Sequence, residues 1–273
     1  MENIFDNILS GFNEKEKNII LGFNEKFIFD LMKKRIEVLG IQGIDEYVAL
    51  IQADSAEKSE FMSSQEVSYS EFFRNPLTFT VLSQIIIPEI VQFERSKRSN
   101  DIRIWSAACA AGQEAYSLAI LLEEYSTISE THTEYNIFAT DINQYHLELA
   151  EAGKFDSLSV RNVSLRRINE FFESTNGYYE IKDKIKKHIN FSIFNLLLDD
   201  CVCPPASIFG DFDIVLCANL LFYYKPEYQQ KILKKIKKCL SANGFIITGE
   251  TERDIMLNNG FIELFPKSCV FKK

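Results

Sequence analysis

The sequence predicts an α/β fold, a doubly wound and mostly parallel sheet that follows a small all-helical N-terminal domain. Short apolar runs typical of buried strands alternate with helical stretches from about residue 102 onward. No strand pattern interrupts the first 64 residues. Two short apolar runs on either side of Pro266 close the chain, and they predict an antiparallel hairpin at the edge of the sheet.

The N-terminal domain is expected to span residues 1–65. Residues 26–39 carry apolar side chains at intervals of three and four, and Gly40 ends that pattern. The basic cluster at residues 33–35 is interpreted either as a solvated helix face or as a docking face for an acidic partner helix. Residues 66–273 then form the larger domain.

A polar bridge at residues 61–75 joins the two domains and ends in an aromatic pair followed by Arg74. Pro76 fits the first turn of a helix that continues to about Ile90. An arginine held between an aromatic pair and a proline has little freedom, which favours the placement of a charge. The alternative is an ordinary surface arginine that lies over a phenylalanine ring.

The stretch 102–122 predicts a strand, a turn of small residues and a helix that opens near Gly112. A helix that begins after such a turn offers free N–H groups to a ligand. A second strand at 136–140 ends at Asp141, where doubly wound folds bind ribose hydroxyls. This pattern indicates a site for a nucleoside-containing cofactor. The turn holds one glycine, not the three of a dinucleotide fingerprint, so no particular cofactor follows, and packing alone would also explain the small residues.

The second half of the chain continues the alternation. Asn176-Gly177 predicts a hairpin turn inside an antiparallel insertion at about residues 170–194. Residues 212–219 and 245–249 predict buried strands, and Pro226 begins the helix between them.

Composition limits the classes of function. A net charge of −9 over 273 residues argues against a large nucleic-acid footprint. The start of the chain lacks the basic and apolar regions of a signal peptide, so we expect a cytoplasmic protein with no direct membrane insertion. The six cysteines and three histidines are scattered, which predicts reduced thiols and no metal site. A monomer is the default expectation.

Several motifs, taken together, resemble the CheR family, the S-adenosylmethionine-dependent glutamate O-methyltransferases of chemotaxis receptors. They occur in the family's order and spacing over about residues 25–273. The matching segments are 72–74, 104–109, 112–119, 139–142, 195–197 and 212–217, with Asn219, Tyr223, Gly244, Gly249 and Glu252. The resemblance implies a class I, Rossmann-like methyltransferase domain over residues 66–273, and an acidic helical segment of a chemoreceptor or similar signalling protein as the partner.

The resemblance also implies roles for individual residues. Arg74 looks like the active-site arginine beside the methyl donor, and Tyr223 like the tyrosine that faces the transferred methyl group. Glu114 resembles the acid that meets the cofactor's amino-acid end, and Asp141 the acid that binds its ribose. The full set of expected cofactor contacts is Ser68, Ser70, Arg74, Ala108, Gly112, Glu114, Asp141, Asn195, Leu196 and Asn219.

Two features depart from the family pattern. The family usually has Cys-Arg-Asn where this chain has Cys217-Ala218-Asn219, which leaves one positive charge fewer to attract a substrate carboxylate. The tight turn at Asn176-Gly177 is shorter than the loop with which some members grip a receptor tail, so we expect no tethered binding. Two alternatives therefore stay open: a methyltransferase for a different carboxylate, or a catalytically weak regulatory protein that binds the cofactor.

The implied reaction is an in-line displacement at a sulfonium methyl group by a glutamate carboxylate. A carboxylate is already ionised at neutral pH, so no general base is required. Catalysis then depends on alignment and on partial desolvation of two opposite charges.

Overall fold

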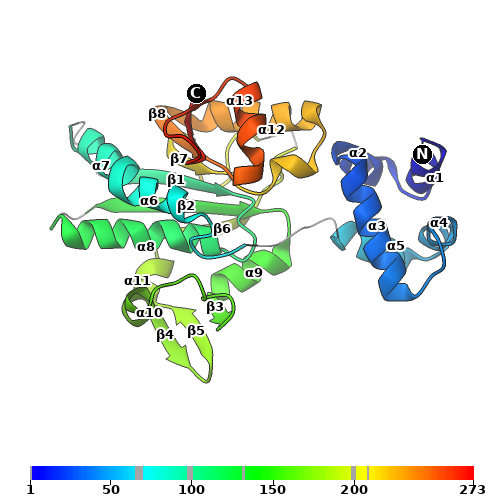
Figure 1. Cartoon of the computed structure of the whole chain (residues 1–273), viewed down its shortest axis with the longest axis horizontal. Coiled ribbons are helices and arrows are strands. Elements are labelled where there is room, and N and C mark those ends of the chain that lie inside the picture. Colours follow the sequence, from blue (N-terminus) through cyan, green and yellow to red (C-terminus); the bar gives the residue numbers. More distant parts are fainter. Residues whose placement is uncertain (1, 65–69, 97–100, 131–132, 198–200, 208) are drawn as a thin grey trace. The chain divides into compact units, whose positions relative to one another are not determined.

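The computed structural model describes residues 2–64, 70–96, 101–130, 133–197, 201–207 and 209–273 (Figure 1). The chain divides into two compact units. The first consists of residues 1–67 and 223–229, and the second of residues 68–222 and 230–273.

The first unit is helical throughout its described N-terminal part. Its helices are α1 (Glu2–Ser10), α2 (Glu14–Gly22), α3 (Glu25–Leu39), α4 (Ile44–Ala53) and α5 (Ser55–Ser64). Asparagine side chains at positions 13 and 24 accept backbone N–H groups at the starts of α2 and α3. Gly40 ends α3 in the left-handed conformation, at φ 69°, as the sequence pattern predicted.

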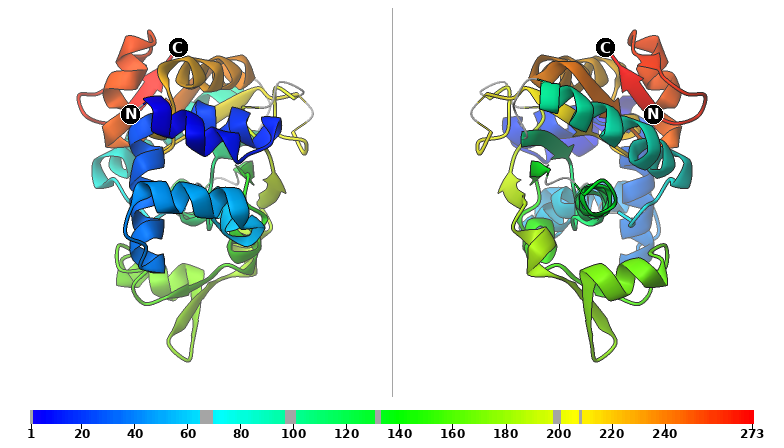
Figure 2. Two further views of the ribbon diagram at one scale, coloured as in Figure 1. Left: turned by 90° about the vertical axis from the view of Figure 1, so that its right-hand side faces the viewer. Right: turned by 90° about the vertical axis from the view of Figure 1, so that its left-hand side faces the viewer.

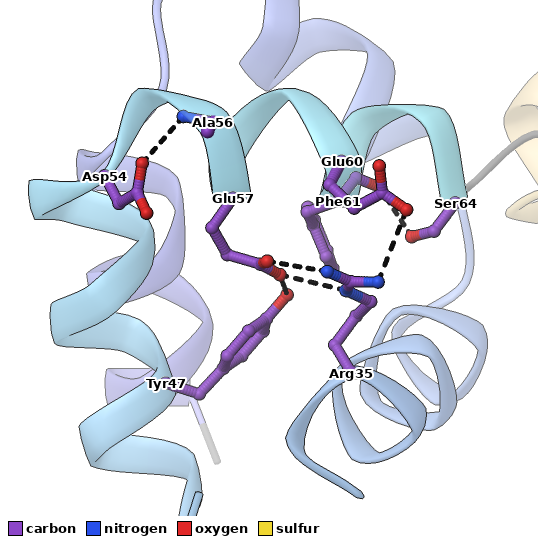
Figure 3. A network of polar contacts seen from close by, with 8 residues as sticks. All are labelled: Arg35, Tyr47, Asp54, Ala56, Glu57, Glu60, Phe61 and Ser64. Atoms are coloured by element: carbon purple, nitrogen blue, oxygen red, sulfur yellow. Dashed lines mark hydrogen bonds and ion pairs between the residues drawn. The ribbon is translucent and has the colours of Figure 1, made fainter. Parts of the chain in front are cut away.

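A buried ion pair links three helices of this unit (Figure 3). The Glu57 carboxylate accepts hydrogen bonds from Arg35 Nη2 at 2.6 Å, Arg35 Nε at 3.0 Å and the Tyr47 hydroxyl at 2.7 Å. The hydrogen bond from Arg35 is the main cause that holds the pKa of Glu57 below its usual range, whereas burial raises the pKa of Tyr47. Arg35 therefore serves an internal contact, while the neighbouring Lys33 and Lys34 are exposed.

The second unit is built on a seven-stranded sheet with the order β6-β2-β1-β7-β8-β10-β9 (Figure 1). Its strands are β1 (Asp101–Ala107), β2 (Glu134–Asp141), β6 (Ile189–Ile193), β7 (Phe212–Leu216), β8 (Leu240–Ile247), β9 (Ile262–Glu263) and β10 (Val270–Lys272). The first five strands in the sheet order are parallel, and β10 is antiparallel to both β8 and β9. The predicted mostly parallel α/β fold and its edge hairpin are confirmed.

The strand order reverses between β1 and β7. From β1 the chain moves outward through β2 to β6, and it then returns to the other side of β1 with β7 and β8. Loops diverge at such a reversal, so the carboxyl ends of β1 and β7 form the place where doubly wound sheets bind ligands. Helices α8 (Gln113–Ile128), α9 (Gln144–Ala152), α12 (Pro226–Cys239) and α13 (Arg253–Asn258) connect the strands.

The core of the sheet is apolar and closely fitted. Trp105 on β1 is fully buried, and its Nε1 donates to Thr140 Oγ1 on β2 at 2.9 Å. Ile104 and Ile214 are also fully buried and lie opposite each other in the register of β1 and β7. These contacts fix the register of β1, β2 and β7, and they therefore also fix the relative positions of the carboxyl ends of these strands.

A second, three-stranded sheet has the order β3-β5-β4. It consists of β3 (Lys154–Asp156), β4 (Phe172–Thr175) and β5 (Tyr178–Ile181), with α10 (Leu165–Phe171) before β4 and α11 (Asp183–Lys186) after β5. The predicted turn at Asn176-Gly177 is present, with φ angles of 51° and 81°. The hairpin of β4 and β5 projects away from the seven-stranded sheet (Figure 2).

The extent expected for this insertion, residues 170–194, was wrong. Residues 189–193 form β6 of the main sheet, parallel to β2, and residues 154–156 join the small sheet instead. The side chains of β6 are half-buried or exposed without strict alternation, so the strand carries little periodic signal of its own.

A long helix precedes the sheet and borders the site. It consists of α6 (Pro76–Val81), a π-helical turn η1 (Leu82–Ile86) and α7 (Ile87–Ser96). By length and composition alone, Pro76–Phe93 is the one helix among the described residues that could cross a membrane. In this fold 44% of that window is buried, and Leu82 and Ile86 lie fully inside the core.

Replacement of Glu57 by glutamine is expected to destabilise the first unit by about 3 kcal/mol, because it leaves the Arg35 charge without its buried partner. Glu60 also contacts Arg35, at 3.3 Å, but 58% of its side chain is exposed. Glu60→Gln is therefore the matched control and should change stability by less than about 1 kcal/mol. Hydrogen exchange of the α3–α5 amides measures both effects, and equal protection in the two variants would contradict this account.

Candidate functional site

The turn after β1 is held in a strained conformation at the carboxyl edge of the sheet. Ala108, Ala110 and Gly112 have φ angles of 59°, 47° and 84°. Alanine rarely adopts such angles, and strain of this kind gathers at functional sites. A Cβ atom on Gly112 would lie 3.1 Å from the Ala150 side chain and 3.2 Å from Tyr116, so the turn has little room for a larger residue.

Asp141 at the end of β2 stabilises this turn. Its side chain is only 8% exposed. One carboxylate oxygen accepts the Ala110 N–H at 2.8 Å, and the other accepts the Asn143 N–H at 3.0 Å. A carboxylate can accept about four hydrogen bonds, so Asp141 retains acceptor capacity for a ligand hydroxyl.

Glu252 connects the ends of β7 and β8. The residue is fully buried, and one of its carboxylate oxygens accepts the N–H groups of Asn219 and Gly249, both at 2.8 Å. The other oxygen accepts those of Leu220 and Leu221, both at 2.6 Å. Burial raises the pKa of Glu252, and the four N–H groups oppose that shift.

Gly249 completes this arrangement, because a Cβ atom there would lie 2.7 Å from Asn219 Oδ1. Asn219 itself has a φ angle of 60°. The backbone that follows β7 is thus fixed in a tight turn against the end of β8, where Glu252 holds it.

A cavity of about 160 Å³ lies between these strand ends and helix α6. We call it the strand-end cavity. Its lining consists of Arg74, Asn75, Thr78, Phe79, Glu114, Leu216, Ala218, Asn219, Ile247, Thr248, Gly249, Glu250 and Thr251. Asn75 Nδ2 and Thr248 Oγ1 are buried and have no hydrogen-bond partner in the described structure. Buried polar atoms without partners are uncommon, and these two are suited to polar groups of a ligand.

Two aromatic residues position Arg74 at this cavity. Phe72 is fully buried and packs edge-on against Phe155, with ring centroids 4.9 Å apart. Phe73 has a φ angle of 50°, and its N–H donates to Ser117 Oγ at 3.1 Å. Contacts of both aromatic residues therefore anchor the backbone before Arg74, as the aromatic pair in the sequence had indicated.

Among the acids that line the strand-end cavity, Glu114 has the most strongly shifted pKa. It is 8% exposed, and burial raises the pKa of this carboxyl to about 7. The positive charge of Arg74 opposes that shift, and the charge of Glu252 adds to it. An acid that titrates near neutrality can change its charge when a cationic ligand group binds beside it.

The structure brings most of the predicted site residues to one edge of the sheet. Arg74, Glu114 and Asn219 line the strand-end cavity, whereas Ala108, Gly112 and Asp141 lie at the ends of β1 and β2. Asn195 and Leu196 follow β6, and the preceding Phe194 N–H donates to the Asp141 carbonyl at 2.9 Å. Their individual roles stay predictions.

Three predicted residues remain, namely Ser68, Ser70 and Tyr223. Ser68 lies outside the described residues. The Ser70 hydroxyl is buried without a hydrogen-bond partner in the described structure. Tyr223 belongs to the first unit, where its ring packs against Phe27 at 4.6 Å and its carbonyl accepts the Asn24 N–H at 2.8 Å. It is not among the residues that line the strand-end cavity.

Several lining residues were not predicted from the sequence, among them Asn75, Thr248 and Glu250. Asn75 had a usable signal, because an asparagine before a proline is a typical helix cap, and its Oδ1 accepts the Thr78 N–H at 3.2 Å. Thr248 and Glu250 follow a predicted strand, but nothing local distinguishes them from other loop residues.

The family model described as "CheR methyltransferase, SAM binding domain" matches residues 68–266. Chemotaxis protein methyltransferase 1 of Pseudomonas aeruginosa is 31% identical over 254 residues, which cover 91% of this chain and 88% of the relative. The chemotaxis protein methyltransferase of Vibrio parahaemolyticus is 30% identical and covers 89% of this chain and 86% of its own length.

Solved structures similar to this chain include PKMT2 from Rickettsia typhi in complex with AdoHcy. It shares 16% identity and has a TM-score of 0.34, over 58% of this chain and 25% of that one. A SAM-dependent methyltransferase from Aquifex aeolicus shares 11% identity and has a TM-score of 0.36, over 67% of this chain and 83% of that one.

The affinity for S-adenosylhomocysteine is expected to rise with pH through about 7. A protonated Glu114 cannot pair with the ammonium group of this ligand, so binding favours the ionised carboxyl and lowers its pKa. With a pKa of about 7 in the free protein, the affinity should increase roughly eightfold between pH 6 and pH 7.5. Calorimetric titrations across this range measure the effect. Glu114→Gln should flatten the profile, whereas the exposed control Glu148→Gln should keep it, and a flat wild-type profile would contradict the role given to Glu114.

Proposed function

This chain belongs to the CheR methyltransferase family and is an S-adenosylmethionine-dependent methyltransferase, and we propose that it forms methyl esters on glutamate side chains of chemoreceptor-type proteins. The observation that carries the proposal is the strand-end cavity, in which Arg74 and Glu114 lie beside the polar ends of β7 and β8. Its relatives from Pseudomonas aeruginosa and Vibrio parahaemolyticus are named chemotaxis protein methyltransferases.

The donor set of the site fits the chemical groups of S-adenosylmethionine. Asp141 has acceptor capacity for ribose hydroxyls, and Glu114 can pair with an ammonium group. The unpartnered Asn75 Nδ2 and Thr248 Oγ1 offer a donor and an acceptor for an amino-acid end. When bound, S-adenosylmethionine supplies an electrophilic methyl group on a positively charged sulfur.

In this proposal the residues of the protein act by positioning the two reactants and by excluding water from them. The acceptor carboxylate is ionised at neutral pH, so no residue has to remove a proton. Arg74 orients the incoming carboxylate through charge-assisted hydrogen bonds. Phe79, Leu216 and Ile247 line the cavity with apolar surface that excludes water from two opposite charges.

The partner in this proposal is an acidic helical segment of a chemoreceptor-type protein. We further propose that the enzyme acts as a monomer in the cytoplasm, without insertion into a membrane and without a nucleic-acid partner. The net charge of −9 supports the last point, because nucleic-acid binding requires basic surface.

One observation favours a second candidate, a methyltransferase for a different carboxylate. Ala218 lines the strand-end cavity where the family usually has an arginine. Among the described lining residues, Arg74 is the one cation, beside the carboxylates of Glu114 and Glu250. A cavity with this excess of negative charge attracts an acidic acceptor less strongly than one with a second arginine.

Arg74 and Asp141 are expected to affect different steps. Asp141→Ala should weaken S-adenosylhomocysteine binding about tenfold or more, because it removes the ribose acceptor and releases the Ala110 turn. Arg74→Ala should lower kcat about a hundredfold with a much smaller loss of affinity, because it removes the group that aligns the acceptor. Calorimetry and base-labile methyl incorporation into receptor fragments measure the two quantities. Equal losses of affinity in both variants would contradict these roles.

Addition of an arginine at position 218 tests the second candidate. If receptor glutamates are the substrate, Ala218→Arg should lower the KM for receptor fragments about fivefold, the equivalent of about 1 kcal/mol for a partly exposed charge pair. Ala218→Met has a long side chain without the charge and is the control. If the wild-type protein forms no ester on receptor glutamates but methylates a small carboxylate, the first candidate fails and the second stands.

A further inference from the structure

A second cavity, of about 340 Å³, lies next to the strand-end cavity. We call it the flanking cavity. It is lined by Phe73, Arg74, Pro76, Phe79, Thr80, Ser83, Asn162 and Arg167. Arg74 and Phe79 line both cavities, so a ligand group in either one can reach the same guanidinium.

One wall of the flanking cavity is the first part of the long helix after Arg74. Pro76, Thr80 and Ser83 are spaced by four and three residues and therefore lie on one helical face. Ser83 belongs to the π-helical turn η1, where the helix is locally wider. Single π-helical turns inside α-helices are rare and frequently occur at functional sites.

An ion pair fixes another part of the lining, Arg167. Arg167 on α10 donates from Nε and Nη2 to the Glu124 carboxylate, at 2.9 and 2.8 Å. The guanidinium carbon lies 4.1 Å from the centre of the Phe73 ring. The cavity is thus formed before any ligand binds, and the pair with Glu124 leaves the donors of Arg167 Nη1 for another partner.

The lining selects a particular chemistry. Its charged members are Arg74 and Arg167, and none of its described residues is acidic. The hydroxyls of Thr80 and Ser83 already donate to helix carbonyls, at 2.7 and 3.0 Å. Phe73, Pro76 and Phe79 add apolar surface. A side chain with a methylene stem and a carboxylate end matches both features, because the stem packs on the rings while the carboxylate meets the guanidinium groups.

We propose that the flanking cavity binds a second acidic side chain of the acceptor protein, next to the glutamate that is methylated. This inference rests on the proposed function, since it assigns the acceptor glutamate to the strand-end cavity. Residues three or four apart on a helix have Cβ atoms about 5–6 Å apart, so one helical segment presents two acids to the two sides of Arg74. The flanking cavity then selects acceptor segments with paired acidic residues.

The test compares two helical peptides, one with a single glutamate and one with a second glutamate four positions away. Their binding to the protein loaded with S-adenosylhomocysteine is measured by calorimetry, and ester formation on each is measured with S-adenosylmethionine. Ser83→Glu places a negative charge in the flanking cavity. Gln92→Glu is the control, because it adds the same charge to the same long helix at an exposed position that lines neither cavity.

The wild-type protein and Gln92→Glu should bind the two-acid peptide about tenfold more tightly than the one-acid peptide, and Ser83→Glu should abolish this preference. Four results would overturn the inference: equal binding of both peptides by the wild type, no binding of either, the same effect in the two variants, or loss of S-adenosylhomocysteine binding in Ser83→Glu, which would assign the cavity to the cofactor. If the preference is present but no ester forms, the proposed function fails, and what stands of the inference is that the flanking cavity binds an acidic side chain. If esters form equally well on both peptides with equal affinity, the inference fails and the proposed function stands.

Discussion

The hydrogen bonds from four backbone N–H groups to the buried Glu252 carboxylate are the constraint on which the rest of the site depends. A carboxylate that is removed from water carries a desolvation cost of several kcal/mol, and only good hydrogen-bonding geometry offsets it. Here the donors come from the turn after β7 and from Gly249 after β8. The anion therefore ties two strand ends together and holds the Asn219 turn that lines the strand-end cavity.

Asp141 fixes the backbone in a similar way on the other side of the strand reversal, at the end of β2. It holds the turn after β1, where Ala108 and Ala110 have left-handed φ angles that alanine rarely adopts. Strained turns of this kind are unfavourable by themselves and persist only when the surrounding contacts fix them. Two acids at the carboxyl edge thus pre-organise the backbone on both sides of the place where a doubly wound sheet binds its ligand.

Local signals in the sequence were sufficient for much of this fold. The apolar run of β1, the small-residue turn, helix α8 and strand β2 were all predicted, because each element has its own pattern and close neighbours in the chain. The Asn176-Gly177 turn was predicted for the same reason. Strand β6 was assigned to the wrong sheet, because its half-buried residues carry no clear period and its partner β2 lies about 50 residues earlier in the chain.

The site was harder to predict from the sequence than the fold was. Arg74, Glu114 and Asp141 stand next to recognisable motifs, and their sequence neighbours already indicated a role. Glu252 matched the family pattern, but the bonds that define it join it to backbone atoms 31 to 33 residues away, which no local pattern records. The flanking cavity is lined by residues of the long helix and of the region around α10, which are far apart in the chain, so no local pattern records it.

A crystal structure of the protein with S-adenosylhomocysteine tests the central claim most directly, namely that these acids pre-form a cofactor site at the carboxyl edge of the sheet. The account predicts ribose oxygens within hydrogen-bond distance of Asp141, an amino-acid end beside Glu114, and unchanged bonds from the four N–H groups to Glu252. Ligand density away from Asp141, or a turn after β7 that has left Glu252, would contradict it.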